Sequence, residues 1–299
     1  MSAQLQKFGY NTNENRPHWT FPANDNAELM KAVYTSFLSL NVDFITTNTY
    51  HYGSTLDESL QSNKEKREEY IKMFKNTCEI LCQLVVQNKK KDTQILGSVG
   101  TLATMYHDLS EYHGNYIELP GSEATTSNYY STILRIFEKE TAIRNLVFET
   151  IPSEKEAEIA LTVLQQFPCF KAVFSFTCKD NAQTRHGETI KEIAKKLSNH
   201  PQVFGIGINC TDSENVLPVL IQLNNYKFQH IFVYPNFGDT KFLSKESKTD
   251  GVFSEKLIRS WVEHNATVMG GCCGIEDSEM RHLRKIVDDL NFEQQANVL

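Results

Sequence analysis

Seven short apolar runs alternate with segments of helical period along this chain. The runs are rich in β-branched and aromatic residues, and each ends in or close to Gly, Thr, Asn or Pro, which is typical of strands. They read VDFITTNT, QILGSVG, NLVFET, KAVFSF, VFGIGIN, HIFVYP and TVMGG. Strands that alternate with helices predict parallel βαβ units, and near-continuous apolarity predicts strands covered on both faces. The sequence therefore predicts an α/β fold around a parallel sheet.

The order of these segments narrows the fold further. A helical segment at residues 26–40 precedes the first predicted strand, so the pattern contains seven strands but eight helices. A (β/α)8 barrel begins with a strand, and we therefore expect such a barrel that lacks its first strand. A doubly wound sheet is the alternative, although no GxGxxG follows an early strand to support nucleotide binding. The 299 residues suit one barrel, and we expect a single domain over residues 1–299.

The charge of the chain limits its partners. A net charge of −7 argues against nucleic-acid binding, which normally needs a basic surface, and favours small-molecule partners. No segment approaches the roughly 20 apolar residues that span a bilayer, and the first residues lack the pattern of a signal peptide. We expect a cytoplasmic protein that does not bind membranes. In that reducing compartment, cysteines are more often metal ligands, catalytic groups or core residues than disulfides.

Three cysteines are placed to share a metal ion. Cys210 closes GIGINC, and Cys272 and Cys273 close TVMGGCC, with one further predicted strand between them. In a parallel barrel both segments end on the carboxyl face, where barrel enzymes keep their active sites. Adjacent cysteines cannot easily form a disulfide with each other, whereas Zn²⁺ favours thiolates and keeps a fourth position open beside three protein ligands. Three unrelated buried cysteines are the alternative; Cys78, Cys82, Cys169 and Cys178 are expected in the core or in loops.

Around these cysteines the chain resembles the homocysteine S-methyltransferase family, whose zinc barrels carry the fingerprints GxNC and GGCCG. Further segments resemble that family in the same order: TNTYHYGS, GSVGT, EYHGNY, FETIPSEKEAE and YPNFG. The resemblance extends from about Leu5 to Val287. It implies a (β/α)8 barrel in which Cys210, Cys272 and Cys273 bind Zn²⁺ and the thiol of homocysteine takes the fourth position.

The resemblance also implies a reaction. A sulfonium compound, S-methylmethionine or S-adenosylmethionine, would donate a methyl group to the bound thiolate of homocysteine and so form methionine. Selenocysteine is the alternative acceptor. Betaine-using relatives resemble the barrel but continue into a long C-terminal arm, so we expect a sulfonium donor. Glu149 matches the acidic residue that holds the substrate amino group. Asn48, Tyr50 and Asn236 fall on the same face by the strand-end rule and are further candidates for substrate binding.

One departure from the family pattern leaves alternatives open. The family's first strand, with its Asp-Gly-Gly turn, should precede the segment that SAQLQKFGY resembles, but Met1 stands where that turn should finish. Either activity is impaired or another segment fills the gap. A second hypothesis is therefore a catalytically impaired barrel that binds a ligand or a partner protein. A third is a thiol-redox protein that uses Cys272 and Cys273. The sequence leaves the oligomeric state open, a monomer included.

Overall fold

One parallel sheet organises the structure, a computed structural model that describes residues 1–14, 18–56, 62–88, 92–236 and 252–296. All seven predicted strands form, and each pairs in parallel with the next along the chain. This confirms the predicted α/β class. The strands are β1 (Phe44–Thr46), β2 (Gln94–Val99), β3 (Asn145–Ile151), β4 (Lys171–Phe176), β5 (Val203–Asp212), β6 (His230–Asn236) and β7 (Val268–Met269).

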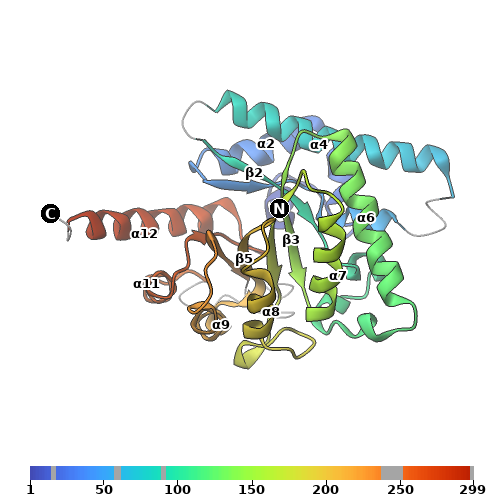
Figure 1. The fold of residues 1–299 in the computed structure, drawn as a ribbon. Helices are drawn as coiled ribbons and strands as arrows, with labels where there is room; N and C mark the ends of the chain where they lie inside the picture. Colours follow the sequence, from blue (N-terminus) through green and yellow to red (C-terminus); the bar gives the residue numbers. More distant parts are fainter. Residues whose placement is uncertain (15–17, 57–61, 89–91, 237–251, 297–299) are drawn as a thin grey trace.

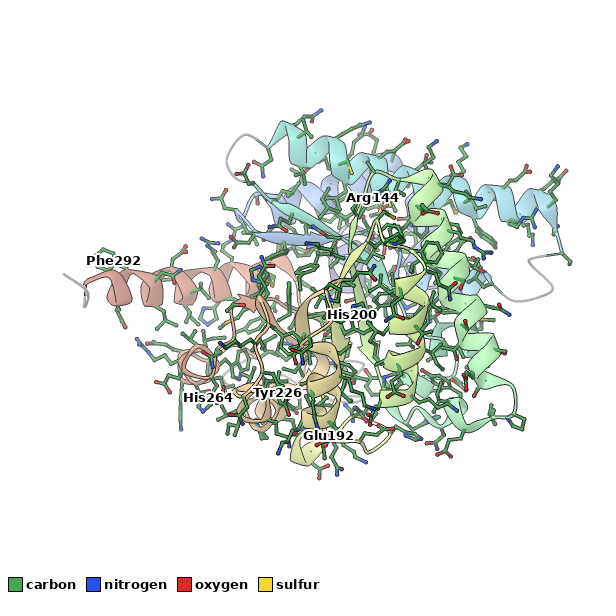
Figure 2. The ribbon with its side chains drawn as sticks, viewed as in Figure 1. Arg144, Glu192, His200, Tyr226, His264 and Phe292 are labelled. Carbon is green, nitrogen blue, oxygen red and sulfur yellow. The ribbon has the colours of Figure 1, made fainter. Side chains whose placement is uncertain are left out.

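The helices surround the sheet in chain order, from α2 and α4 through α6, α7 and α8 to α9 and α11 (Figure 1). As predicted, a helix precedes the first strand. Helix α12 extends beyond the rest of the molecule, and its Phe292 is 75% exposed (Figure 2). The helices are α1 (Ser2–Lys7), α2 (Ala27–Leu38), α4 (Lys64–Gln87), α5 (Ala103–Tyr106), α6 (Ser122–Glu140), α7 (Glu154–Gln165), α8 (Ile190–Leu197), α9 (Val216–Leu223), α11 (Glu255–Glu263) and α12 (Asp277–Ala296).

The sheet curls until its first and sixth strands touch. The ring of Phe44 in β1 lies 5.1 Å from the ring of Phe232 in β6, measured between centroids. Among the described residues, β1 pairs only with β2 and β7 only with β6, so both are edge strands. The structure is thus a curled sheet of seven parallel strands. Helices α1 and α12 meet near these edges, where the Lys7 ammonium contacts the Asp277 carboxylate at 2.5 Å.

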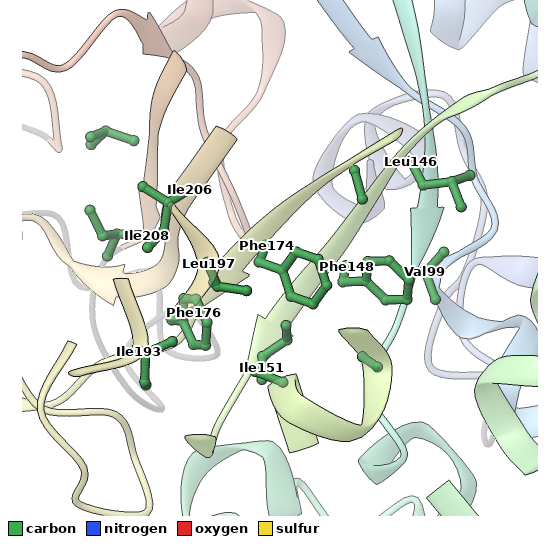
Figure 3. Close-up of a cluster of buried hydrophobic side chains, with 14 of the residues drawn as sticks. Val99, Leu146, Phe148, Ile151, Phe174, Phe176, Ile193, Leu197, Ile206 and Ile208 are labelled. Carbon is green, nitrogen blue, oxygen red and sulfur yellow. The ribbon is translucent and has the colours of Figure 1, made fainter. Parts of the chain in front are cut away.

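Alternate residues of the strands build two apolar layers. Val147 and Val173 belong to a small cluster inside the curl together with Phe232, whereas Phe148 and Phe174 face the surrounding helices. The rings of Phe148 and Phe174 stack with centroids 4.9 Å apart in this outer layer (Figure 3). Such alternation follows from the two-residue period of a strand. It explains why the strands are apolar throughout, as the sequence indicated.

Within the described residues, no helix is long and apolar enough to cross a membrane.

Candidate metal centre

Cys210 is turned toward the site by an irregularity near the end of β5. The pairing of β5 with β6 shifts register between Asn209 and Asp212, and Cys210 has a left-handed backbone with φ of +47°. A residue other than glycine rarely adopts this conformation, because its Cβ approaches the backbone closely. The side chain is 5% exposed. Strain of this kind persists where the surroundings hold it, and it often marks a functional position.

Cys272 and Cys273 follow β7 in a tight loop. The backbone N–H of Cys272 donates to the carbonyl of Pro235 at 2.9 Å, which ties the loop to the end of β6. A Cβ on Gly271 would lie 2.3 Å from Ile275, and Gly274 has φ of +82°. These two positions therefore require glycine, whereas a Cβ on Gly270 would make an ordinary contact at 3.5 Å.

The three cysteines converge as predicted. The Sγ of Cys273 lies 3.8 Å from the Sγ of Cys210 and 4.0 Å from that of Cys272, and all three sulfurs lie within 4.8 Å of one another. Tetrahedral Zn²⁺ binds sulfur at about 2.3 Å, which places two ligand sulfurs about 3.8 Å apart. Cys272 and Cys273 are partly exposed, so the triangle is open on one side. The residues present therefore fit a thiolate metal site with an accessible fourth position.

The three thiols perturb one another. Hydrogen bonds from Cys210 and from Cys272 lower the pKa of Cys273 well below its usual value. The pKa of Cys210 rises because of its hydrogen bonds with Cys272 and Cys273 and because of burial. A cation at the centre would favour the thiolate form of all three, since coordination displaces thiol protons.

Asn209, which the sequence analysis did not single out, joins the cysteines to β3. Its Oδ1 accepts the backbone N–H of Thr150 at 2.9 Å and the hydroxyl of Ser175 at 2.7 Å. Its Nδ2 donates to the Thr150 hydroxyl at 2.8 Å and approaches the Sγ of Cys272 at 3.8 Å. Thr150 also has a left-handed backbone, with φ of +65°. One buried amide thus holds two strained strand ends together beside the sulfurs.

Glu149 lies on β3 beside this amide network. Burial raises the pKa of its carboxyl to about 7. A hydrogen bond from Ser98 lowers this pKa, and the charge of Cys272 raises it. The Ser98 hydroxyl donates to its Oε1. Glu149 is only partly covered by protein atoms. The predicted substrate-binding carboxylate therefore sits near the thiol cluster, in a setting that favours pairing with a cation.

The other three predicted substrate-binding residues differ in their surroundings. Tyr50 is partly exposed, and burial, followed by the charges of Glu111 and Cys210, raises the pKa of its hydroxyl. Asn48 is buried, and its Nδ2 donates to the Thr20 carbonyl at 2.8 Å and to Asn24 Oδ1 at 2.9 Å. Asn236 is buried at the end of β6. Substrate binding by these residues stays a prediction. To donate to a substrate, the Asn48 amide would have to give up its hydrogen bond to Thr20 or Asn24.

The remaining cysteines lie outside the site. Cys78 is buried in α4 and Cys178 is buried just after β4, whereas Cys82 is half-buried and Cys169 is exposed. None of these four belongs to the cluster of metal-binding geometry found in the described residues. The core or loop positions expected for them are confirmed.

The family model described as homocysteine S-methyltransferase matches residues 1–287. The chain belongs to the homocysteine S-methyltransferase family. A betaine-homocysteine S-methyltransferase of Drosophila melanogaster is 28% identical over 98% of this chain and 93% of its own length. Homocysteine S-methyltransferase 3 of Arabidopsis thaliana is 27% identical over 96% of this chain and 88% of its own length. A selenocysteine methyltransferase of Astragalus bisulcatus is 25% identical over 96% of this chain and 90% of its own length.

A solved member of the family has the same fold. The metallated form of the homocysteine methyltransferase MmuM from Escherichia coli superposes with a TM-score of 0.79 at 22% identity, covering 95% of this chain and 93% of that one. At this identity the likeness establishes the fold alone. Zinc binding is characteristic of the family, and the thiol triangle of this chain has the donor type that a soft metal ion requires.

Proposed function

We propose that this chain transfers a methyl group from a sulfonium donor to the thiol of homocysteine, with Zn²⁺ held by Cys210, Cys272 and Cys273. The observation that carries the proposal is the triangle of three sulfurs, open on one side, in a member of this family. When bound, zinc would favour loss of the homocysteine thiol proton and hold the sulfur at the fourth position. We further propose that residues 1–299 act as one homocysteine-binding barrel domain.

The residues of the chain supply position and charge. Glu149 would pair with the ammonium group of homocysteine, because its partly buried carboxylate lies beside the cysteines. Asn209 would orient Cys272 through its amide hydrogen. In the reaction, the bond between donor sulfur and methyl carbon breaks as the bond from the acceptor sulfur forms, so that homocysteine becomes methionine. The thiol proton leaves to solvent, and the remaining catalysis is alignment of the two sulfurs.

The methyl donor in this proposal is a sulfonium compound. S-methylmethionine and S-adenosylmethionine both carry a sulfonium charge, which an electron-rich set of thiolates and carboxylates attracts. Chain length does not distinguish a sulfonium-using enzyme from a betaine-using one. The Drosophila relative that is named for betaine is matched over 93% of its own length. This removes the expected argument from a long C-terminal arm. Selenocysteine stays the alternative acceptor, in line with the name of the Astragalus relative.

A catalytically impaired barrel is the second candidate. The observation that favours it is the pair of edge strands, β1 and β7, which find no partner on their outer sides among the described residues. Open edges reduce the stability of a sheet and offer backbone groups to another chain. Under this candidate the cysteines would still bind metal, but methyl transfer would be absent.

Metal content and methionine formation test the proposal together. We expect the purified protein to hold about one zinc per chain and to form methionine from homocysteine and S-methylmethionine. Cys210→Ala should lose both. Cys169→Ala is a matched control, because Cys169 is exposed and lies outside the cluster. Bound zinc without methionine formation from S-methylmethionine, S-adenosylmethionine or betaine would favour the impaired barrel. A wild-type protein without zinc would refute the mechanism.

A further inference from the structure

The inner face of the curled sheet changes from apolar to polar toward the carboxyl ends of its strands. The buried members of the apolar cluster inside the curl are Leu96, Val147, Val173 and Phe232. Side chains two positions apart in a strand point to the same face of the sheet. The next inward residues along the same four strands are Ser98, Glu149, Ser175 and Tyr234. A layer of polar side chains therefore lies directly above an apolar floor.

Tyr234 lies where this polar layer meets the loop that carries two of the cysteines. In the pairing of β5 with β6 it stands opposite Asn209, whose Nδ2 approaches the Sγ of Cys272 at 3.8 Å. The carbonyl of the next residue, Pro235, accepts the backbone N–H of Cys272 at 2.9 Å. A Cβ on Gly270 would lie 3.5 Å from the Cβ of Tyr234. These contacts place Tyr234 beside the thiol cluster.

The hydroxyl of Tyr234 is the unpaired group of the layer. It is buried and forms no hydrogen bond with any residue that the structure describes. Its neighbours in the layer already have partners: the Ser175 hydroxyl donates to Asn209 Oδ1 at 2.7 Å, and Glu149 Oε1 accepts the Ser98 hydroxyl. A buried hydroxyl without a partner is unfavourable, and nearly all such groups in folded proteins are paired. The Tyr234 hydroxyl is thus a donor available to a ligand in the site.

We propose that the Tyr234 hydroxyl donates a hydrogen bond to the carboxylate of homocysteine. This rests on the proposed function, in which the homocysteine sulfur takes the fourth metal position and Glu149 pairs with the ammonium group. Because the ammonium and the carboxylate are attached to one carbon atom, a donor for the carboxylate must lie near Glu149. Tyr234 belongs to the same inward layer as Glu149 and lies beside the cysteines.

This contact would make the site selective for thiols that are also amino acids. A hydrogen bond to an ionised acceptor is among the stronger hydrogen bonds in proteins. Ser98 and Ser175 are the other hydroxyl donors of the layer, and each would have to release Glu149 or Asn209 before it could serve the substrate. Tyr234 can donate without breaking any hydrogen bond within the described protein.

Removal of the hydroxyl alone tests the proposal by calorimetry on the zinc-loaded protein. Tyr234→Phe should bind homocysteine about tenfold or more weakly than wild type, because a hydrogen bond to a charged group is lost. Its affinity for 3-aminopropane-1-thiol, which is homocysteine without the carboxylate, should change less than about twofold. Tyr226→Phe is the matched control, since Tyr226 precedes β6 and so lies at the opposite ends of the strands from the cysteines. The control should bind both thiols as wild type does.

Two further measurements distinguish this contact from a structural role. Tyr234→Phe should also weaken binding of 4-sulfanylbutanoate, which is homocysteine without the amino group, whereas Glu149→Gln should not. Because the hydroxyl has no partner among the described residues, Tyr234→Phe should not lower the free energy of unfolding of the ligand-free protein, measured by urea denaturation. A destabilised Tyr234→Phe would contradict the proposal by showing that the hydroxyl supports the fold.

The binding data also separate this inference from the proposed function. Unchanged affinity of Tyr234→Phe for homocysteine, or equal losses for homocysteine and 3-aminopropane-1-thiol, would overturn the contact with the carboxylate and leave the proposed function intact. Zinc-loaded wild-type protein that does not bind homocysteine would overturn the proposed function, and this inference with it.

Discussion

The ring of Phe44, at the first residue of β1, packs against the ring of Phe232 in β6, with centroids 5.1 Å apart and planes inclined by 67°. Phe44 also lies 5.3 Å from the ring of His230. These contacts join the first strand to the sixth, and Phe44 and Phe232 belong to the small cluster inside the curl. Packing inside the curl therefore holds β1 against β6, although β1 and β7 form no backbone pairing among the described strands.

Phe232→Ala should destabilise the protein strongly. Phe232 is buried, and its removal leaves a cavity at the contact that brings β1 to β6. We expect a loss of about 3–5 kcal/mol in the free energy of unfolding, measured by urea denaturation. Phe8→Ala, which removes a ring that is 45% exposed, should cost far less and serves as the control. Equal effects of the two substitutions would show that the interior contact does not hold the curl.

Asn209→Ala should weaken the metal site although it removes no ligand. The substitution removes the amide that donates toward Cys272 and that holds the strained Thr150. Loss of a group that orients a ligand typically reduces metal affinity about tenfold to a hundredfold. Competition with a zinc chelator measures the change. Asn224→Ala, at the exposed end of α9, should leave the affinity unaltered; unchanged affinity in Asn209→Ala would contradict the assigned role.

Glu156→Ala should cost more stability than Glu156→Gln. Alanine leaves the Leu102 amide and the hydroxyls of Tyr116 and Tyr130 without their acceptor in a buried place, at a cost of about 1–3 kcal/mol for each unsatisfied group. Glutamine keeps an oxygen acceptor without a charge. Urea denaturation of both variants gives the comparison, and equal losses would mean that packing, rather than these hydrogen bonds, is what Glu156 supplies.

The stability difference between the wild type and Glu156→Gln should depend on pH. Burial raises the pKa of Glu156 above its usual 4.5, so the folded protein binds this proton more tightly than the unfolded chain does. The free energy of unfolding therefore falls as pH rises above about 4.5, until the pKa of the folded state is passed. Glu156→Gln lacks this contribution. Its stability relative to wild type should increase between pH 4 and pH 7, and a constant difference would contradict the assignment.

Homocysteine binding should improve as pH rises through neutrality. Burial raises the pKa of Glu149 to about 7, and only the ionised carboxylate pairs with the substrate ammonium. KM for homocysteine should therefore fall between about pH 6 and pH 8. Release of the thiol proton adds to this slope. In Glu149→Gln only release of the thiol proton still depends on pH, so KM for homocysteine should fall less steeply. Identical pH profiles for the variant and the wild type would argue against an ammonium partner at Glu149.

Local sequence patterns were sufficient to predict several features of the structure. The alternation of apolar runs and helical segments gave all seven strands, because a strand covered on both faces must be apolar throughout. Cys210, Cys272 and Cys273 could be grouped because parallel strands bring their carboxyl ends to one face. In GGCCG, a close approach at Gly271 and a positive φ at Gly274 leave few residues other than glycine possible.

Other features depended on contacts between distant segments. The left-handed conformation of Thr150 in β3 is held by Asn209 of β5, and no local pattern reports such a constraint. Ser153 and Glu156 have the sequence spacing of a capping box. In the structure Ser153 does cap α7, but the Glu156 carboxylate accepts bonds from Leu102, Tyr116 and Tyr130 instead.

The sequence by itself thus determined which elements form and which cysteines gather, because strand period, helix period and strand direction are local properties of the chain. Only the tertiary structure decided how far the sheet curls and which amide lies beside Cys272. Those outcomes depend on side chains that lie tens of residues apart and meet only when the core is packed, as Phe44 and Phe232 do.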